Sequence, residues 1–238
     1  MGAGRGIIIT GGTGGLGAAV VARFLRDEYR VAVPYRSDVE WRALAQAHEA
    51  AARDAALMGI PADLTDEDST HAAIDRAAEA FSGLSALVHL AGGYAGGTPV
   101  EHLDAAVLRR MIDTNLVSAF WAAKHVLPHV KRSAHGRLLF ISSRGAVVTE
   151  PGASAYAAAK AGLSALVLTL ARELRADSVT ANAILPSVID TAGNRTAMPG
   201  ADPSRWVRPE EIATLLAFLA SEAAASISGA LIPIYGRA

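Results

Sequence analysis

The chain of 238 residues contains no cysteine. This absence excludes a disulfide scaffold, a Cys-ligated metal site, an iron–sulfur cluster and thiol catalysis. Aromatic residues make up only 5%, and 22 Lys+Arg nearly balance 23 Asp+Glu, for a formal net charge of −1. A chain with this balance has no bulk attraction for nucleic acid or for an anionic membrane surface. We therefore expect neither of them as a partner.

Long hydrophobic runs are also missing. The longest apolar run, residues 161–171, is about half the length that a membrane span needs, and it contains Ser164 and Thr169. The stretch Met1–Gly6 is too short and polar for a signal peptide. Gly6 also stands where a myristoylation signal requires Ser or Thr. We expect a cytoplasmic protein with no membrane segment.

Hydrophobic residues make up 51% of the chain, and they form short β-branched runs that alternate with helical patterns. Most of these runs are continuously apolar, which is typical of strands covered on both faces in a parallel sheet. The pattern predicts an α/β fold: one single-domain doubly wound (Rossmann-type) parallel sheet of about seven strands flanked by helices, over residues 1–238. The expected strands are 6–10, 31–35, 56–60, 86–90, 138–142, 179–185 and 230–235, and the expected helices are 16–28, 39–53, 66–81, 103–131, 153–176 and 210–220.

Three longer irregular stretches each follow an expected strand: residues 91–99, 144–152 and 186–208. In a doubly wound sheet, ligands bind beyond the carboxyl ends of the strands. All three stretches belong on that rim, which predicts a single cleft.

A glycine-rich loop, Thr10-Gly11-Gly12-Thr13-Gly14-Gly15-Leu16-Gly17, joins the first strand to the first helix. Glycines let the backbone turn tightly and approach a pyrophosphate where a Cβ would collide, and the helix start offers unpaired N–H groups to phosphates. Several glycine registers fit, and a merely flexible turn is the alternative. A Walker loop is excluded, because no Lys-Ser/Thr pair follows the last glycine.

Thr10-Gly11-x-x-x-Gly15-x-Gly17 resembles the glycine motif of the short-chain dehydrogenase/reductase family, and the resemblance extends over nearly the whole chain. The further motifs that carry the resemblance are Ala62-Asp63-Leu64, His89-Leu90-Ala91-Gly92, Asn115 in an Asn-Leu-x-x-x-Phe stretch, Ile141-Ser142-Ser143, Tyr156-x-x-x-Lys160 and Pro186-Ser187-Val188-Ile189-Asp190-Thr191. Two of these motifs depart from the usual family pattern: His89-Leu90 replaces an Asn pair, and Ser187 replaces a Gly.

The resemblance implies a nicotinamide cofactor, and the end of the second strand bears on which one. Tyr35 stands where NAD-preferring relatives carry Asp, whereas Arg36-Ser37 resembles the NADP-preferring arrangement, in which a guanidinium pairs with the 2′-phosphate. Against this, Asp38 is near enough to bind a ribose hydroxyl, and Gly14 stands where many NADP-preferring relatives carry a basic residue. We favour NADP(H) over NAD(H), with a solvated surface charge as the alternative for Arg36. The expected cofactor-binding residues are Gly11, Thr13, Gly14, Gly15, Leu16, Gly17, Arg36, Ser37, Asp63, Leu64, Ala91, Gly92, Tyr156, Lys160, Pro186, Ile189 and Thr191.

Tyr156 and Lys160 lie four residues apart in a helical stretch, so both side chains share one face. A phenol has an ordinary pKa of about 10, and acting near pH 7 would require roughly 4 kcal/mol of preferential phenolate stabilisation. A Lys ammonium beside an oxidised nicotinamide can supply that stabilisation. Tyr156 is then the general acid for carbonyl reduction and the general base in reverse. Alone, such a pair is common on helix surfaces.

Ser143 lies 13 residues before Tyr156 and just beyond a strand. Its hydroxyl can hold the substrate oxygen, and the alternative is an ordinary turn cap. Family spacing selects Ser143 over Ser142. The resemblance places Asn115 as the fourth catalytic residue, which bends its helix and supports a proton relay through Lys160; the alternative is a mid-helix Asn bonded to the backbone.

Other chemistries find little support in the sequence. His125 and His129 lie one turn apart, but no acidic residue stands in the adjacent turn, so a solvated helix face is favoured and no metal is expected. Ser143 lacks the Gly-x-Ser-x-Gly surroundings of a hydrolase nucleophile. His89 can donate to a backbone carbonyl, so its replacement of the usual Asn bears on stability rather than against catalysis.

We expect hydride transfer between NADP(H) and a carbonyl/secondary alcohol pair, with a 3-ketoacyl compound as one candidate substrate. The alternatives are C=N or C=C reduction on the same fold and a non-catalytic dinucleotide sensor. Residues 186–208 should cover the substrate, and Arg195 or Arg205 could meet an anionic group there. The resemblance also implies a homo-oligomer, a tetramer or a dimer, although the ending Tyr235-Gly236-Arg237-Ala238 lacks the paired glycines that are usual in the family.

Overall fold

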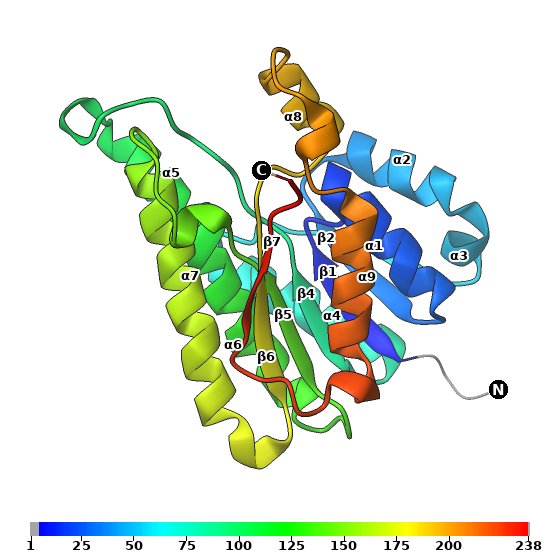
Figure 1. Ribbon diagram of the computed structural model, residues 1–238. Coiled ribbons are helices and arrows are strands. Elements are labelled where there is room, and N and C mark those ends of the chain that lie inside the picture. The colour runs from blue at the N-terminus through cyan, green and yellow to red at the C-terminus, as the bar shows by residue number, and fades with distance from the viewer. Residues whose placement is uncertain (1–4, 238) are drawn as a thin grey trace.

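The computed structural model describes residues 5–237, so the expectation that the first residues carry no targeting signal falls, for residues 1–4, outside the described part. Within that part, seven parallel strands form one sheet in the order β3-β2-β1-β4-β5-β6-β7 (Figure 1). This confirms the expected doubly wound α/β fold. The strands are β1 Gly6–Thr10, β2 Arg30–Tyr35, β3 Leu57–Pro61, β4 Ala86–His89, β5 Arg137–Ile141, β6 Thr180–Pro186 and β7 Leu231–Ile234.

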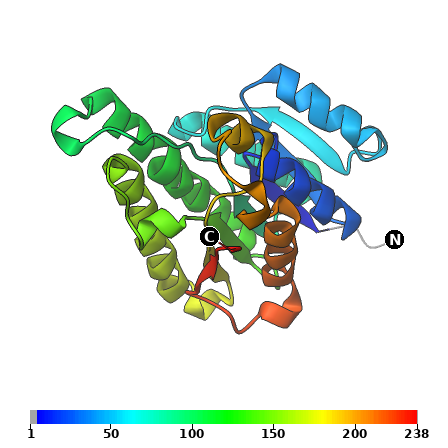
Figure 2. The ribbon, with the colours of Figure 1, turned by 45° about the horizontal axis from the view of Figure 1, so that its top comes forward.

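Helices cover both faces of this sheet, as Figure 2 shows from above. Alternate residues of each strand point to opposite faces, and β1 illustrates this: Ile7 and Ile9 pack against α1 and α9, whereas Ile8 packs against α4, α6 and α7. All three side chains are fully buried, which explains the continuously apolar strand sequences. The helices are α1 Gly15–Arg26, α2 Asp38–Ala47, α3 Glu49–Arg53, α4 Glu67–Phe81, α5 Ala105–Ile112, α6 Ser118–Val130, α7 Ser154–Glu173, α8 Ala192–Ala197 and α9 Pro209–Ala220.

Two expected helices are interrupted. The helix expected over 103–131 contains a π turn at Asp113–Val117, between α5 and α6. The helix expected over 39–53 breaks at His48, whose backbone has φ −129° and ψ 44°. Both interruptions lie inside otherwise helical sequence. The π turn contains Asn115, one of the site residues expected from the sequence.

The helix α7 is long and apolar enough to cross a membrane by length and composition, the one such helix in residues 5–237. Its side chains Leu163, Val167 and Leu170 are, however, part of the hydrophobic core between α4, α6 and the sheet. α7 is thus a core helix of the fold. Figure 1 shows it along one side of the sheet.

The segment 186–208 is more ordered than an irregular loop. It contains α8 and a 3-10 turn at Pro203–Arg205, and a parallel bridge joins Ile189 to Val207. Trp206, only 8% exposed, anchors its end. α8 projects above the carboxyl ends of the strands (Figure 1).

Candidate active site

In the glycine loop between β1 and α1, neighbouring backbone atoms leave no room for a side chain at Gly11 and Gly17. Gly11 has φ +67°, and a Cβ there would meet Ala91 N at 2.8 Å. A Cβ on Gly17 would overlap the Gly11 carbonyl oxygen, whereas one on Gly14 would meet that oxygen at 3.5 Å, an ordinary contact. The loop therefore requires Gly11 and Gly17, and it tolerates more at Gly14.

The first turn of α1 presents its backbone N–H groups without a side-chain cap. The N-cap residue is Gly14, which makes no side-chain bond, and no acidic residue occupies the first turn. Uncapped N–H groups and the helix dipole favour an anion such as a pyrophosphate. They open into a cleft of about 440 Å³ whose walls include Gly11, Thr13, Gly14, Gly15, Leu16, Gly17, Arg36, Ser37, Asp63, Leu64, Ala91 and Gly92, all predicted from the sequence, together with Pro34, Tyr35, Glu40, Ala62, Thr65, Leu90, Thr114 and Ser118.

At the end of β2, the cleft is bounded by an aromatic stack and a helix cap. The ring of Tyr35 lies parallel to that of Trp41, with 5.5 Å between centroids. The Ser37 hydroxyl accepts the Glu40 N–H at 3.3 Å and so caps α2. Arg36 is exposed beside them, and its charge helps to lower the pKa of Asp63.

The Asp63 carboxylate is committed to a local turn. Its Oδ1 accepts hydrogen bonds from the Thr65 N–H at 2.9 Å and from the Thr65 hydroxyl at 2.7 Å. These bonds, the backbone one first, hold the pKa of Asp63 below its ordinary value. Asp63 therefore shapes the cleft wall through this turn.

Asn115 joins the π turn to the loop that follows β4. Its side chain is fully buried. Nδ2 donates to Gly93 O and Met111 O, each at 3.0 Å, and Oδ1 accepts the Gly93 N–H at 3.1 Å. The backbone bonding expected of a mid-helix Asn is therefore present, and the expected support of a proton relay through Lys160 stays a prediction. A Cβ on Gly92 would lie 2.7 Å from Asn115 Oδ1 and 3.3 Å from Lys160 Nζ, so glycine is needed there for the close approach.

His89, at the end of β4, bonds to two hydroxyls rather than to a backbone carbonyl. Its Nδ1 lies 3.0 Å from Thr10 Oγ1, and its Nε2 lies 3.3 Å from Ser118 Oγ. Because Ser118 donates its proton to Thr114 O at 2.8 Å, its oxygen must accept from His89 Nε2–H, and Nδ1 accepts from Thr10. Burial lowers the pKa of His89 to about 3, so the ring is neutral. His89 thereby ties β1 to the helix that carries Asn115.

Tyr156 lies in the first turn of α7 with Ser143 and Tyr94 beside it. Burial raises the pKa of Tyr156, and a hydrogen bond with the Ser143 side chain offsets part of this rise. The Tyr94 ring packs edge-on against the Tyr156 ring, with 5.0 Å between centroids. A lowered pKa was expected from the sequence. Loss of water around the buried phenol, however, outweighs the stabilising contact with Ser143, and the pKa is raised.

Ser143 and Ser142 face different surroundings. Ser142 is buried, and its hydroxyl bonds to Lys160 O at 3.0 Å and to Ser164 Oγ at 2.9 Å inside the fold. Ser143 is partly exposed and accepts the Gly145 N–H at 3.0 Å. Its hydroxyl therefore caps a turn and also reaches Tyr156. Of the two serines, only Ser143 is partly exposed on the Tyr156 side, and its choice as the substrate-binding serine stays a prediction.

Lys160 is buried one helical turn beyond Tyr156, with 4% of its surface exposed. Its Nζ donates to Ile141 O at 2.8 Å. Burial lowers the pKa of Lys160 to about 8. The ammonium therefore lies between the end of β5 and the loop after β4.

The segment after β6 reaches the glycine loop through Thr191. Its methyl group would lie 3.0 Å from a Cβ on Gly15, and its hydroxyl caps α8 by accepting the Asn194 N–H at 3.2 Å. Pro186 ends β6, and Ile189 O accepts a bond from Asn194 Nδ2 at 2.8 Å. Of the three expected cofactor-binding positions after β6, Thr191 therefore contacts the glycine loop, whereas Pro186 and Ile189 are not among the residues that line the cleft.

The two arginines expected to meet an anionic substrate already have partners. Arg195 forms a bidentate pair with Asp190, at 2.6 and 2.8 Å. Arg205 binds the Arg237 carbonyl through Nε and Nη2 at 3.2 and 3.1 Å. In both cases the guanidinium holds the segment 186–208 in place.

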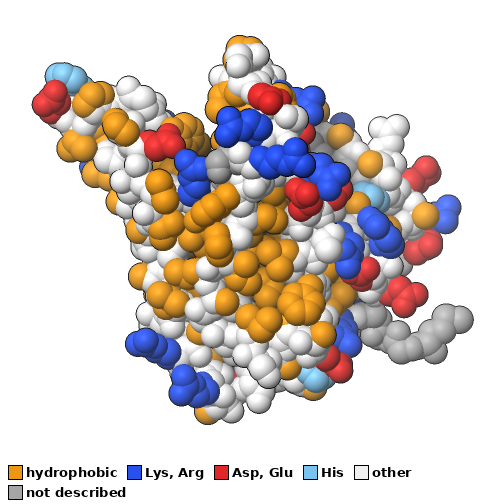
Figure 3. Space-filling model, viewed as in Figure 1, with side chains coloured by type: hydrophobic (Ala, Val, Ile, Leu, Met, Phe, Trp, Pro, Cys, Tyr) orange, Lys and Arg blue, Asp and Glu red, His pale blue; other side chains and the backbone are white. Residues whose placement is uncertain are grey.

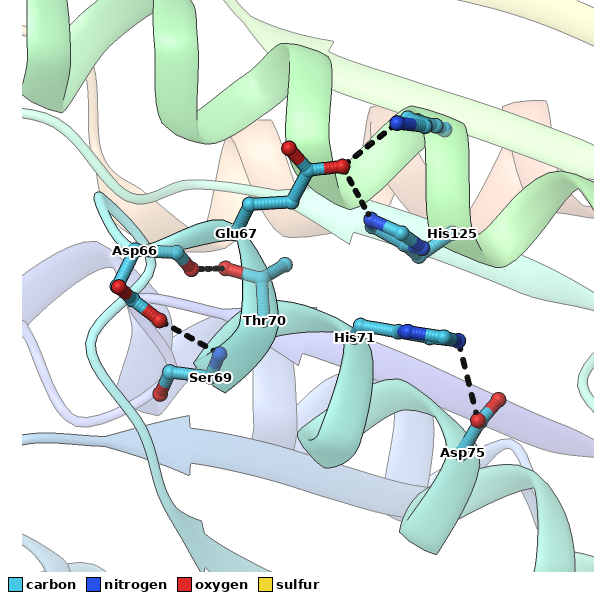
Figure 4. A network of polar contacts seen from close by, with 8 residues as sticks. Asp66, Glu67, Ser69, Thr70, His71, Asp75 and His125 are labelled. Atoms are coloured by element: carbon cyan, nitrogen blue, oxygen red, sulfur yellow. Dashed lines mark hydrogen bonds and ion pairs between the residues drawn. The ribbon is translucent and has the colours of Figure 1, made fainter.

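The interpretation of His125 and His129 as a solvated face is wrong. Their side chains are only 13% and 14% exposed, and acids of α4 pair with them: Glu67 with His125 at 3.1 Å and Asp75 with His129 at 3.2 Å. Figure 4 shows the Glu67–His125 part of this contact between helices, with Asp75 paired to His71 and the rings of His71 and His125 stacked. The acids come from another helix, which sequence spacing does not reveal. In residues 5–237 no group of three or more His, Asp or Glu side chains is arranged to hold a metal ion.

Tyr94 and Glu40 were not predicted from the sequence. Tyr94 lies in the stretch 91–99, which was assigned to the rim, but only Ala91 and Gly92 were named there. Glu40 Oε2 accepts a hydrogen bond from Thr13 Oγ1 at 3.0 Å across the cleft. The only available signal for Glu40 was its place in the first turn after Arg36-Ser37.

Comparison with known proteins matches this geometry to a family. The model of the short chain dehydrogenase family matches residues 5–201. The chain is 36% identical to cis-4-hydroxycyclohexanecarboxylate dehydrogenase of Sinomonas cyclohexanicum, over 96% of this chain and 94% of the relative. It is 31% identical to the 3-oxoacyl-acyl-carrier-protein reductase MabA of Mycobacterium tuberculosis, over 98% and 92%.

Solved structures agree with the sequence relatives. A short-chain type dehydrogenase/reductase from Mycobacterium ulcerans superposes with a TM-score of 0.92 at 29% identity, covering 98% of this chain and 89% of that one. A short-chain dehydrogenase/reductase from Serratia marcescens BCRC 10948 gives 0.90 at 32% identity, covering 99% and 98%. The chain therefore belongs to the short-chain dehydrogenase family and is an NAD(P)-dependent oxidoreductase acting on carbonyl/alcohol substrates.

Proposed function

We propose that this enzyme reduces a carbonyl compound to a secondary alcohol with NADPH as the favoured cofactor, and that Tyr156 is its acid and base. The observation that carries the proposal is the grouping of Tyr156, Ser143 and Lys160 around the end of β5 and the start of α7, beside Gly92, which lines the cleft. Ser143 lies close enough to the phenol to offset part of the rise in pKa that burial causes, and Lys160 Nζ would lie 3.3 Å from a Cβ on Gly92, which lines the cleft. Acid, oxygen-binding hydroxyl and dinucleotide cradle thus meet on one rim.

The chain's own groups have separate roles in this proposal. The nicotinamide, when bound, supplies the hydride for reduction. Ser143 donates a hydrogen bond to the substrate oxygen, and Tyr156 transfers its proton to that oxygen. A raised pKa keeps Tyr156 protonated at neutral pH, which suits reduction. Lys160 holds positive charge near the phenol, and Asn115 fixes the Gly93 backbone beside it.

The preference for NADP(H) over NAD(H) is supported by Arg36. Its side chain is exposed on the wall of the cleft, and no ion pair engages it in the described residues. A guanidinium offers forked donors that suit a 2′-phosphate. Thr13, Ser37 and the first turn of α1 complete a polar lining for the adenosine half.

For the substrate, we propose a ketone or 3-ketoacyl compound with an apolar body. Tyr94 and Val147 are 67% and 58% exposed in the two rim loops that flank Tyr156. The dehydrogenase of a cyclic hydroxy acid and the 3-oxoacyl reductase among the relatives also fit an apolar substrate. The segment 186–208 would cover this substrate from the α8 side.

The test is a screen of NADPH and NADH oxidation across cyclic ketones, ketoacyl thioesters, imines and enones, repeated with Tyr156→Phe. We expect ketone reduction to fall at least about 10³-fold in the variant, because the transferred proton is lost, while cofactor binding is retained. Tyr29→Phe, which alters a phenol packed on Phe24, is the matched control. Imine or enone turnover without ketone turnover would replace the proposal by C=N or C=C reduction. Cofactor binding without any turnover would favour a sensor.

We also propose that the enzyme is cytoplasmic and a homo-oligomer, a dimer or a tetramer. The absence of cysteine fits a reducing compartment. Exposed apolar side chains on α7 and α9 support self-association.

A further inference from the structure

A carboxylate stands in the adenosine end of the cleft, facing the glycine loop. Glu40 belongs to the first turn of α2, and its Oε2 accepts the Thr13 hydroxyl proton at 3.0 Å. Both residues line the cleft, as do Arg36 and Ser37. The bond links α2, in the connection between β2 and β3, to the glycine loop, and it holds the carboxylate at the cleft wall.

Taken together, the charged side chains that line this cleft attract a 2′-phosphate less strongly than Arg36 alone would. They comprise one cation, Arg36, and two carboxylates, Glu40 and Asp63. Asp63 is occupied by its Thr65 turn, and the field of Arg36 reaches it. Glu40 makes a single bond, to a neutral hydroxyl, and its charge has no cationic partner in the described residues.

A carboxylate interacts differently with a ribose that has a free 2′-hydroxyl and with one that carries a 2′-phosphate. Carboxylate oxygens accept hydrogen bonds from hydroxyls. They repel a phosphate, whose charge is about −2 at neutral pH, and this repulsion is worth on the order of 1 kcal/mol at water-like dielectric over several ångströms.

We propose that Glu40 sets the cofactor specificity of the enzyme: its carboxylate opposes the 2′-phosphate of NADP(H) and accepts a ribose hydroxyl of NAD(H), against the pull of Arg36. This inference rests on the proposed dinucleotide function of the same cleft. The Thr13 bond keeps Glu40 on the cleft wall, and Glu40 and Arg36 act as opposing determinants. The enzyme then prefers NADPH less than Arg36 alone would dictate.

The experiment measures dissociation constants for NADPH and NADH by titration of tryptophan fluorescence, without substrate, in wild type, Glu40→Gln and Glu49→Gln. Glu49 opens α3, is exposed and does not line the cleft, so its variant carries the same charge change elsewhere. We expect Glu40→Gln to raise the affinity for NADPH relative to NADH about tenfold, and Glu49→Gln to leave the ratio unchanged. The gain should shrink at high salt, because exposed charges are screened.

A ratio in Glu40→Gln within about twofold of wild type would overturn the inference, as would an equal shift in Glu49→Gln. Glu40→Ala, which also removes the charge, serves if the Gln variant is unstable, and thermal unfolding checks both. The proposed function fails in a different way: wild type would bind neither cofactor, or Arg36→Ala would leave NADPH affinity unchanged.

Discussion

Burial of the Lys160 amine lowers both its pKa and the stability of the fold at neutral pH. Its side chain is 4% exposed and has one hydrogen-bond acceptor, Ile141 O. Burial lowers its pKa to about 8 from the ordinary 10.5. The folded state therefore resists holding this proton, although the proposed chemistry uses the charge. Stability is lower at neutral pH than an apolar side chain at this position would allow.

This linkage predicts a pH-dependent difference between wild type and Lys160→Met. Between about pH 8 and 10.5 the unfolded chain binds more protons at this site than the folded chain, so stability rises with pH in that window. We expect the free energy of unfolding of wild type, relative to the variant, to rise by up to about 3 kcal/mol from pH 7 to pH 10. Urea unfolding of both proteins across this range measures it. Parallel pH profiles would contradict the prediction.

Contacts between residues were predictable from the sequence where both residues lie in one motif or one helical turn. They were not predictable where the partner lies far away in the sequence. Tyr156 and Lys160 share one helix, and their pairing follows from spacing. The bond from Thr13 to Glu40 and the edge-on contact of Tyr94 with Tyr156 join different loops. Those contacts depend on how strands are ordered in the sheet, which residue spacing alone does not determine.

At the scale of elements, the strands were the most predictable part. β2 was expected at 31–35 and runs Arg30–Tyr35, because strands buried on both faces have continuously apolar sequences. The π turn at Asp113–Val117 was not expected as such. Its wider turn is held by the bonds of Asn115 to Gly93, a tertiary contact outside the helix.

The glycine loop predicts unequal effects of two similar substitutions. Gly17→Ala places a methyl group on the Gly11 carbonyl, whereas Gly14→Ala meets its nearest atom at 3.5 Å. We expect Gly17→Ala to lower the free energy of unfolding by about 1–3 kcal/mol through overpacking and to abolish dinucleotide binding, while Gly14→Ala remains near wild type in stability. Urea unfolding and cofactor titration check both variants. Equal losses would show that the loop, rather than one contact, limits substitution.

The whole molecule brings together residues that are distant in sequence, because each crossover returns the chain to the same edge of the sheet. The glycine loop, Asn115, Tyr156 and Thr191 all lie beyond the carboxyl ends of parallel strands. This convergence was predictable from the alternation of strands and helices. That residues 1–238 form a single domain and that 186–208 covers the substrate remain predictions.

An apolar surface between α7 and α9 predicts self-association. Figure 3 shows hydrophobic side chains gathered on this face. Leu168 of α7 and Phe218 of α9 are 39% and 43% exposed. We expect sedimentation velocity to give a dimer or tetramer, and Leu168→Asp with Phe218→Asp to shift it toward the monomer. Val39→Asp is the control, since Val39 is 77% exposed on α2. A monomeric wild type, or an equal effect of Val39→Asp, would refute the prediction.

The closure of the last residues against Arg205 has a practical consequence. Arg237 N donates to Arg205 O at 3.0 Å, and the Arg205 guanidinium returns two bonds to the Arg237 carbonyl. Arg5 precedes β1 at the opposite end of the strands. An affinity tag or surface linker joined before Arg5 leaves the substrate side open. One joined after Arg237 would disturb the hydrogen bonds between Arg237 and Arg205 that hold the 186–208 segment. Immobilised enzyme should therefore be attached through its amino end.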